Sequence, residues 1–423
     1  MHSVDLIMVG CGPSNLAVSV AIEEKKKHSN IKSSIILEKD SSVCWHRGML
    51  FPEAQSQVSF LKDLVTQRDP TSKFSFLNFL HKTQRLDQFI NLQTFNPFRK
   101  EISNYLQWVA DNLKKTQVVY DFKVIDITPE IDELGKITGW RITSEKGEEF
   151  RAKKIIYGGG RDLNIPEAFL NLSSLKVIHS VNYLSSLNQA NKQNVKNIAV
   201  VGGAQSSAEI YQSCLEEFPN AKVSMIMRSI GLVNYEGSQF TNTLFQNDYI
   251  NTHYEKDESI KAGVLKAMRT TNYAGVAPAT LSGLYRFHYL QEMNGFKRAA
   301  MHTQCEIISA AENAHGISIT WKDNIRDRVC NESFDLVFLG TGFKNKTPAL
   351  FNKIQSVLQI EKIKVTRKYR AILPYAEGVS LHLQGVNEES HGIADSLLSV
   401  LALRSREIVD DILVNDEVEN AFI

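Results

Sequence analysis

The sequence predicts an α/β protein with two Rossmann-like units, each built as strand, glycine turn and helix, and a smaller, mainly helical insertion. The first observation is the apolar run 4–9, which ends in a glycine turn at 10–15 and continues into a helix-compatible apolar run at 16–22. The second observation is that the same order recurs at 197–209. A chain of 423 residues is long enough for two or three domains.

Composition and charge exclude several classes of protein. The 48 Lys and Arg residues balance 47 Asp and Glu residues for a net charge of +1, so we expect no nucleic-acid partner. No apolar run reaches the roughly 18 residues of a membrane span, and the N-terminus lacks the pattern of a signal peptide. The five cysteines include no C-x-x-C pair, which argues against a disulfide framework and favours a cytoplasmic location.

The first glycine turn, Gly10-x-Gly12-x-x-Asn15, departs from the dinucleotide-binding pattern only at its third position, where asparagine replaces glycine. Gly10 permits the tight turn, and Gly12 lets the backbone approach a pyrophosphate closely. The helix that begins at Pro13 directs free N–H groups and a partial positive charge toward the same point. We therefore expect these four residues to bind FAD or NAD.

The second turn, Gly202-x-Ala204-x-x-Ser207, is a degenerate form of the same pattern. Alanine replaces the glycine that permits the closest approach of a pyrophosphate. Taken alone, this turn is only a weak indication of a bound nucleotide.

The residues that follow the second strand of each unit carry opposite charges. Glu38 ends the β-rich run 34–38, where a carboxylate can accept the ribose hydroxyls of an adenosine, and Lys39 follows it. Arg228 takes the equivalent place after the run 223–227, where a guanidinium pairs with a 2′-phosphate that a carboxylate would repel. We therefore expect FAD at the first unit and NADPH at the second. Because no redox-active cysteine pair is present to receive the electrons, a monooxygenase that uses O2 is the leading class.

The rest of the chain is assigned around these two units. Residues 42–110 are rich in aromatic residues and are expected to form helices and loops over the first unit, with Phe74, Phe76 and Phe79 in the core. Two further apolar strands that end in glycines are expected at 154–160 and 334–343, and a C-terminal helix is expected at 393–413.

These assignments predict that the two ends of the chain build one domain around the other. The FAD-binding domain is expected at 1–164 and 341–423, and the NADPH-binding domain at 165–231 and 301–340. The helical segment 232–300 is expected to contribute the substrate pocket.

Six further stretches carry motifs, at 45–50, 57–70, 76–80, 272–273, 340–343 and 391–399. One contains Phe-Leu-Lys-Asp-Leu-Val-Thr from Phe60, and another begins His-Gly-Ile-Ala-Asp at His391. Together these stretches resemble the flavin-dependent N-hydroxylating monooxygenases of siderophore biosynthesis. That family includes the L-ornithine N5- and L-lysine N6-monooxygenases and their diamine-hydroxylating relatives, and the resemblance covers nearly the whole chain.

The resemblance implies a reaction and an assembly. In the family, NADPH reduces FAD, O2 adds to give a C4a-hydroperoxyflavin, and the neutral terminal amine of the substrate attacks its distal oxygen to leave a hydroxylamine. A free amine has a pKa of about 10.4, so the site must desolvate or otherwise neutralise it. Family members are commonly dimers or tetramers, and a homo-oligomer is therefore expected.

The resemblance also implies further cofactor contacts. Gln57 is expected beside the flavin as a catalytic residue, and Arg99 near the cofactors, with an ordinary surface arginine as the alternative. Gln205 and Ser206 are expected at the NADPH turn. The remaining contacts that the family pattern implies are Trp45, His46, Asn272, Thr341, Gly342 and Leu397.

Four residues match the family's substrate-binding positions. Lys62 matches a lysine that pairs with the substrate α-carboxylate, although a structural charge in a salt bridge is an alternative. Asn242 and Asn272 match asparagines that hold the head group and the reacting amine, so that Asn272 is also a catalytic candidate, and Ser399 is added to them.

The sequence departs from the ornithine pattern near the substrate head group. Residues 237–243 lack the Pro and Glu that usually flank the asparagine, and Ala274-Gly275 replaces a small polar continuation. L-Ornithine is the first expectation, and L-lysine, putrescine, cadaverine and histamine stay open as substrates.

No histidine is expected to act as an acid or a base. His46 and His391 are expected to be hydrogen-bonded structural residues, and no group of residues has metal-ligand spacing. Two rival functions are weighed. A Baeyer–Villiger or S-oxygenating enzyme is disfavoured because its F-x-G-x-x-x-H motif is absent at 175–180, and a non-catalytic flavin-binding module because the candidate site residues are retained.

Overall fold

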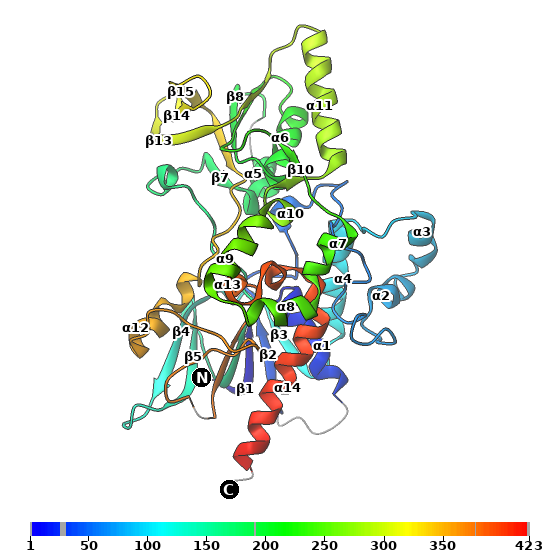
Figure 1. Cartoon of the computed structure of the whole chain (residues 1–423), viewed down its shortest axis with the longest axis vertical. Helices are drawn as coiled ribbons and strands as arrows, with labels where there is room; N and C mark the ends of the chain where they lie inside the picture. The colour runs from blue at the N-terminus through cyan, green and yellow to red at the C-terminus, as the bar shows by residue number, and fades with distance from the viewer. Residues whose placement is uncertain (1, 26–30, 190–191, 377, 421–423) are drawn as a thin grey trace.

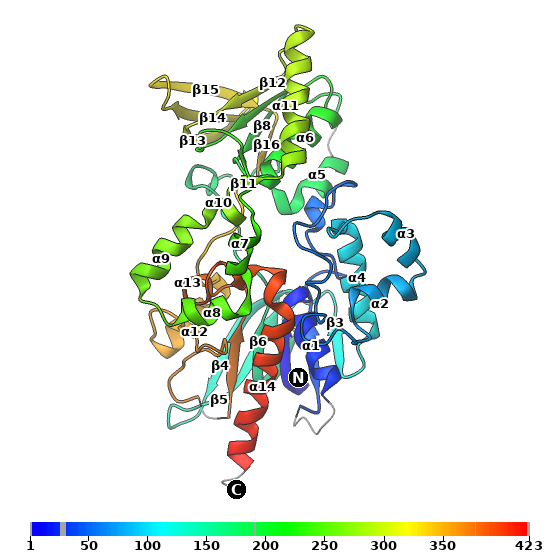
Figure 2. The same ribbon diagram turned by 45° about the vertical axis from the view of Figure 1, so that its right-hand side comes forward.

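The computed structural model describes residues 2–25, 31–189, 192–376 and 378–420. The molecule is elongated, with a large sheet near one end and a second sheet near the other (Figures 1 and 2). The helices of residues 239–272 lie between them in both views. The predicted α/β class with two Rossmann-like sheets is confirmed.

The first sheet contains seven strands within the described residues, in the order β3-β2-β1-β6-β5-β4, and β17 also pairs with β6. Strands β3, β2, β1, β6 and β17 run parallel, whereas β4 and β5 join through antiparallel pairing. The strands are β1 (His2–Val9), β2 (Ser34–Leu37), β3 (Thr116–Val119), β4 (Val124–Ile131), β5 (Ile137–Ser144), β6 (Glu149–Tyr157) and β17 (Ser380–Leu383).

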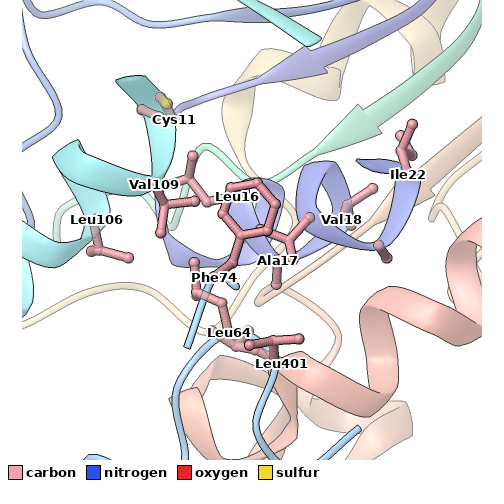
Figure 3. Close-up of a cluster of buried hydrophobic side chains, with 14 of the residues drawn as sticks. Cys11, Leu16, Ala17, Val18, Ile22, Leu64, Phe74, Leu106, Val109 and Leu401 are labelled. Carbon is pink, nitrogen blue, oxygen red and sulfur yellow. The ribbon is translucent and has the colours of Figure 1, made fainter. Parts of the chain in front are cut away.

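One face of this sheet is covered by helices from distant parts of the chain. They are α1 (Pro13–Glu24), α4 (Arg99–Asn112) and α14 (Leu401–Asn420), with α2 (Phe76–Lys82) and α3 (Leu86–Asn91) packed outside α4. Figure 3 shows Phe74 in the core beside Leu16 of α1, with Val109 of α4 and Leu401 of α14 close by. The predicted burial of Phe74, Phe76 and Phe79 is confirmed.

The second sheet is parallel and has five strands within the described residues, in the order β12-β9-β8-β16-β7. The strands are β7 (Val177–His179), β8 (Asn197–Val201), β9 (Lys222–Ile226), β12 (Ala299–His302) and β16 (Leu336–Leu339). Helices α5 (Tyr183–Gln189), α6 (Gln205–Glu217) and α11 (Pro278–Met293) accompany it. A smaller antiparallel sheet of β13 (Cys305–Asn313), β14 (Gly316–Asp323) and β15 (Arg328–Phe334) packs beside it.

The segment 232–300 has two locations rather than one. Its first part contains β10 (Val233–Asn234), α7 (Gln239–Asn242), α8 (Asn247–Tyr254), α9 (Glu258–Ala267), α10 (Arg269–Asn272) and β11 (Gly275–Val276). Helices α8 and α9 pack on α13 (Glu388–His391), which follows the first sheet, whereas α11 packs on α6 of the second sheet. The predicted insertion thus connects the two parts of the molecule.

The C-terminal helix begins later than its apolar spacing predicts. Residues 393–400 form two short 3-10 helices, and α14 starts at Leu401. The remaining helix, α12 (Asn352–Leu358), packs against β4.

Candidate functional site

The first glycine turn joins β1 to α1. Gly10 has a φ of +88°, and a Cβ atom there would lie 2.8 Å from the Cα atom of Gly159, so only glycine fits. A Cβ atom on Gly12 would meet only the Gly158 carbonyl oxygen, at an ordinary 3.8 Å. Helix α1 starts at Pro13, and no side chain caps its N-terminus. The free N–H groups at this end can therefore donate hydrogen bonds to an anionic ligand.

The carboxylate of Glu38 lies against the same turn. Its oxygens accept the backbone N–H of Cys11 at 2.7 Å and of Asp40 at 3.0 Å. Glu38 directly follows β2, and Lys39 beside it is exposed. An acid fixed between the strand end and the glycine turn suits the ribose of a dinucleotide.

Asn15, the third residue of the fingerprint, is wholly buried. Its Nδ2 donates to the carbonyl oxygens of Val9 and Gly10, both at 2.8 Å, and its Oδ1 accepts from Nε2 of Gln384 at 3.0 Å. The bonds of this side chain are thus made inside the protein, and the place of Asn15 at the cofactor stays a prediction. Asn15 holds the shape of the turn, because its amide is fully occupied inside the protein.

The second glycine turn joins β8 to α6. Gly202 has a φ of +134°, and a Cβ atom there would lie 2.6 Å from the carbonyl oxygen of Gly340. Ser207 at the third position is buried and donates to that oxygen at 2.9 Å. No side chain caps the N-terminus of α6, where Ser206 is half-buried.

Arg228 lies beside this second turn. It follows β9 by two positions, and its neighbours Met227 and Ser229 are the side chains that a Cβ atom on Gly203 would meet. The guanidinium is exposed and has no ion pair among the described residues. Two turns with uncapped helix ends, one beside an acid and one beside an unpaired base, fit two dinucleotides of different chemistry.

The loop after the first unit carries Trp45 and His46, whose ring centroids lie 4.2 Å apart. Trp45 packs on the core of the first sheet. His46 is exposed, and its ring has no hydrogen bond among the described residues. The prediction of a hydrogen-bonded structural histidine is therefore wrong for His46.

The same prediction is confirmed for His391, which is buried. Its Nε2 lies 3.1 Å from the Arg367 carbonyl oxygen, and its Nδ1 lies 2.9 Å from Ser390 Oγ.

Gln57 lies on a loop that is held against the residues before α4. The backbone of Ser56 donates to Pro97 and accepts from Asn96, while the Gln57 side chain is exposed. The loop thus presents this amide away from the core.

Lys62 is half-buried, and its ammonium group has no hydrogen bond or ion pair among the described residues. Burial lowers the pKa of this ammonium. The neighbouring Asp63 is occupied elsewhere, because its oxygens accept the N–H groups of Val65, Thr66 and Phe76. The salt-bridged alternative for Lys62 is therefore wrong, and the ammonium is available for a ligand.

Arg99 is the first residue of α4 and is mostly buried. Its guanidinium donates to both carboxylate oxygens of Glu209, at 2.8 and 2.7 Å. The alternative of an ordinary surface arginine is therefore wrong. Gln205, at the start of α6, donates to the same carboxylate at 2.8 Å.

The remaining candidates come from separate segments. Thr341 and Gly342 follow β16 and form hydrogen bonds with the backbone and the side chain of Asn164, which lies in the connection between the two sheets. Leu397 is half-buried and Ser399 is buried in the turns before α14. Asn242 ends α7 and is exposed, whereas Asn272 ends α10 and its side chain lies outside the described part of the structure.

Two charged residues at the site were missed from the sequence. Arg404 of α14 is buried, pairs with Asp395 at 3.1 Å, and donates to Ser14 Oγ in the first turn of α1 at 3.0 Å. Arg404 lies between Leu401 and Ile408 at the spacing of the apolar face of the helix, and this spacing could have indicated its burial from the sequence. Glu209 is the other missed residue, and the sequence around it does not distinguish it from an ordinary helical glutamate.

No group of three or more His, Cys, Asp or Glu side chains within the described residues could hold a metal ion. Over the same part of the chain, no helix has both the length and the apolar character needed to cross a membrane.

Comparison with known proteins identifies the family. The family model for L-lysine 6-monooxygenase/L-ornithine 5-monooxygenase matches residues 2–345. An L-ornithine N(5)-monooxygenase of Pseudomonas aeruginosa is 32% identical over 412 residues, which cover 96% of this chain and 92% of the relative.

Two solved structures agree with this match. The ornithine hydroxylase PvdA from Pseudomonas aeruginosa superposes with a TM-score of 0.90 at 31% identity, covering 98% of this chain and 99% of that chain. The ornithine N-hydroxylase KtzI of Kutzneria sp. 744, described with reduced FAD, NADP+ and L-ornithine, gives 0.90 at 30% identity and covers 98% and 100% of the two chains. The motifs and these full-length matches together show that the chain belongs to the L-lysine 6-monooxygenase/L-ornithine 5-monooxygenase family.

Proposed function

We propose that the protein is an FAD- and NADPH-dependent monooxygenase that N-hydroxylates the terminal amine of L-ornithine and so supplies a hydroxamate precursor for siderophore biosynthesis. The observation that carries the choice of an amino acid is Lys62, a half-buried ammonium without a partner among the described residues. Support for the cofactors comes from the two glycine turns, and from the reduced FAD, NADP+ and L-ornithine named for the Kutzneria relative.

The chain's own residues bind and orient the cofactors and the substrate. Gly10, Gly12 and the start of α1 would hold the FAD pyrophosphate, with Glu38 on the ribose. Arg228 would hold the 2′-phosphate of NADPH beside the Gly202 turn. The bound FAD would supply the activation of O2 with electrons from NADPH, so that one oxygen atom would enter the amine and the other would leave as water.

Lys62 binds the α-carboxylate of the substrate in this proposal. A half-buried ammonium without a partner is poorly solvated, and a carboxylate would restore the lost interactions through charge-assisted hydrogen bonds. Asp63 cannot compete for the ammonium, because four hydrogen bonds from Val65, Thr66 and Phe76 already satisfy its oxygens.

The reacting amine has to lose its proton before it can attack. The side chains proposed near it, Gln57, Asn242 and Asn272, are neutral amides. Amide oxygens accept N–H bonds without the full charge of a carboxylate, and they therefore favour the charged amine less.

The test compares an amino acid with a diamine that lacks the carboxylate. We expect Lys62→Ala to raise the KM for L-ornithine by about 10–100-fold, because a charge-assisted bond of about 1.5–3 kcal/mol is lost, and to leave kcat nearly unchanged. Putrescine turnover should not change. Lys82→Ala, at an exposed lysine of α2, is the matched control.

The measurement is the initial rate of hydroxylamine formation at varied substrate concentration, with NADPH consumption followed alongside. Equal KM values for the wild type and Lys62→Ala with L-ornithine would refute the carboxylate role. Wild-type preference for putrescine, cadaverine or histamine would instead identify a carboxylate-free amine as the substrate, and preference for L-lysine would identify the longer amino acid.

The proposal includes a homo-oligomer in the cytoplasm. Helix α11 exposes Tyr285, Tyr289 and Met293 at four-residue spacing on one face, which suits burial against a second copy. All five cysteines are free, as in a reducing compartment. Light scattering of the purified chain measures the oligomeric state.

A further inference from the structure

One ion pair links a helix of the first sheet to a helix of the second. Arg99 begins α4, which packs on α1, and Glu209 lies one turn into α6, which follows the Gly202 turn. Their contact is bidentate, with N–O distances of 2.8 and 2.7 Å, and the two side chains are only 14% and 12% exposed.

Each partner of this pair reaches a candidate cofactor segment. Nη1 of Arg99 also donates to the carbonyl oxygen of Met49, at the end of the Trp45–His46 loop, at 3.2 Å. Oε1 of Glu209 also accepts from Nε2 of Gln205, the first residue of α6, at 2.8 Å.

Gln205 extends the link to a third segment. Its Oε1 accepts the backbone N–H of Ala277 at 2.7 Å, and its Nε2 also reaches Thr280 at 3.2 Å, at the start of α11. Both ends of the Gln205 amide are thus occupied by protein. The Glu209 carboxylate is the centre of the network, since it receives all three of its donors from Arg99 and Gln205.

A buried ion pair is weak evidence for stability, and in some proteins such a pair instead fixes one arrangement of the elements that carry it. Hydride transfer between two bound cofactors needs their reacting atoms within about 3–3.5 Å, and a 1 Å misplacement can reduce a rate by about 100-fold. A rigid link between the two glycine-turn units would meet this need.

We propose that Glu209 is a positioning residue that fixes the Gly202 turn relative to the flavin-side loop and so sets the geometry of flavin reduction. This inference rests on the proposed function. Glu209 would touch neither cofactor and would act through Arg99 and Gln205.

The experiment uses the full-length protein loaded with FAD. We expect Glu209→Gln to lower the limiting rate of flavin reduction at saturating NADPH by on the order of tenfold, with the dissociation constants of FAD and NADP+ unchanged. Arg99→Lys, which keeps the charge but cannot form the bidentate contact, should lower the same rate. Glu217→Gln is the matched control, because Glu217 lies on α6 in an exposed pair with Lys192.

A second readout does not depend on activity. Hydrogen exchange of the amides in the first turns of α4 and α6 should be faster in Glu209→Gln than in the wild type and in Glu217→Gln. Unchanged limiting rates and unchanged exchange would overturn the proposal, as would a rate loss explained entirely by weaker NADP+ binding. If NADPH fails to reduce the wild-type flavin, the proposed function fails, while the exchange measurement still tests the link.

Discussion

At the residue scale, the two strand-end charges distinguish the two candidate nucleotide sites. Glu38 is fixed by two backbone N–H groups, whereas Arg228 is exposed and has no ion pair among the described residues. A carboxylate that is already oriented suits neutral ribose hydroxyls, and an unpaired guanidinium suits a phosphate.

Arg228→Gln should weaken the use of NADPH and leave the use of NADH unchanged. The variant loses charge-assisted bonds to the 2′-phosphate, and the KM for NADPH should rise by about 10–100-fold. Steady-state rates with each nucleotide measure the effect, and Arg406→Gln, at an exposed arginine of α14, serves as the control. An equal loss with both nucleotides would contradict a phosphate-specific role.

Single residues differed in how far the sequence could predict them. Gly10, Gly202 and Glu38 were predictable because their roles depend on local backbone geometry and on the end of a strand. The role of Asn15 depends on Gln384, and that of Arg99 on Glu209, so their contacts required the folded chain.

At the element scale, the side chain of Asn15 holds the first glycine turn, at a position that is usually glycine and therefore usually has no side chain. Asn15 of α1 ties together the end of β1 and Gln384 after β17. The third position of the fingerprint usually needs glycine for close packing of helix and strand. Here Gly158 supplies the space instead, because a Cβ atom there would lie 2.7 Å from the Asn15 side chain.

Asn15→Ala should therefore destabilise the protein. Buried groups of Val9 and Gln384 would lose their partner, at about 1–3 kcal/mol for each unsatisfied group. The free energy of urea unfolding measures this loss. Asn112→Ala removes an exposed side-chain bond to Trp108 and should change stability by less than about 0.5 kcal/mol. Similar stabilities of the two variants would contradict the structural role of Asn15.

The elements themselves were largely predictable where hydrophobic period and glycine turns agree. Strands β1, β2, β6, β8, β9 and β16 follow that pattern, whereas the short parallel strands β3, β7, β12 and β17 were not predicted. The start of α14 was not predictable. Residues 393–400 share the apolar spacing of the helix, but they form 3-10 helices after Gly392, whose φ is +80°. The division of segment 232–300 was also hidden, since its helices pack on different sheets.

At the scale of the whole molecule, buried histidines make stability depend on pH. His391 stacks on Tyr369, with ring centroids 4.2 Å apart, and is closed off from water. Burial lowers the pKa of His391 from 6.5 to about 4, with the charges of Arg367 and Arg404 acting in the same direction. Burial likewise lowers the pKa of His382.

The direction of the pH dependence of stability follows from these lowered pKa values. The unfolded chain binds the proton more readily than the folded chain, so stability is full above about pH 6.5 and falls as the pH is lowered toward 4. His391 alone should account for a loss of about 2 kcal/mol between pH 7 and pH 5. Urea unfolding at pH 5, 6 and 7 measures the slope, which His391→Gln should reduce and His81→Gln, at an exposed position, should not. Equal slopes in the wild type and His391→Gln would refute this account.

The contact of Arg404 with Ser14 has a consequence for biosynthesis. Strand β17 and helix α14 leave the ribosome after the second sheet, yet they complete the first sheet and contact the glycine turn, both of which begin before that sheet. The second sheet, between β7 and β16, is complete in the nascent chain before them. The first sheet can therefore be completed only after the second sheet has been synthesised, and until β17 arrives, residues 154–157 of β6 lack this partner along one side.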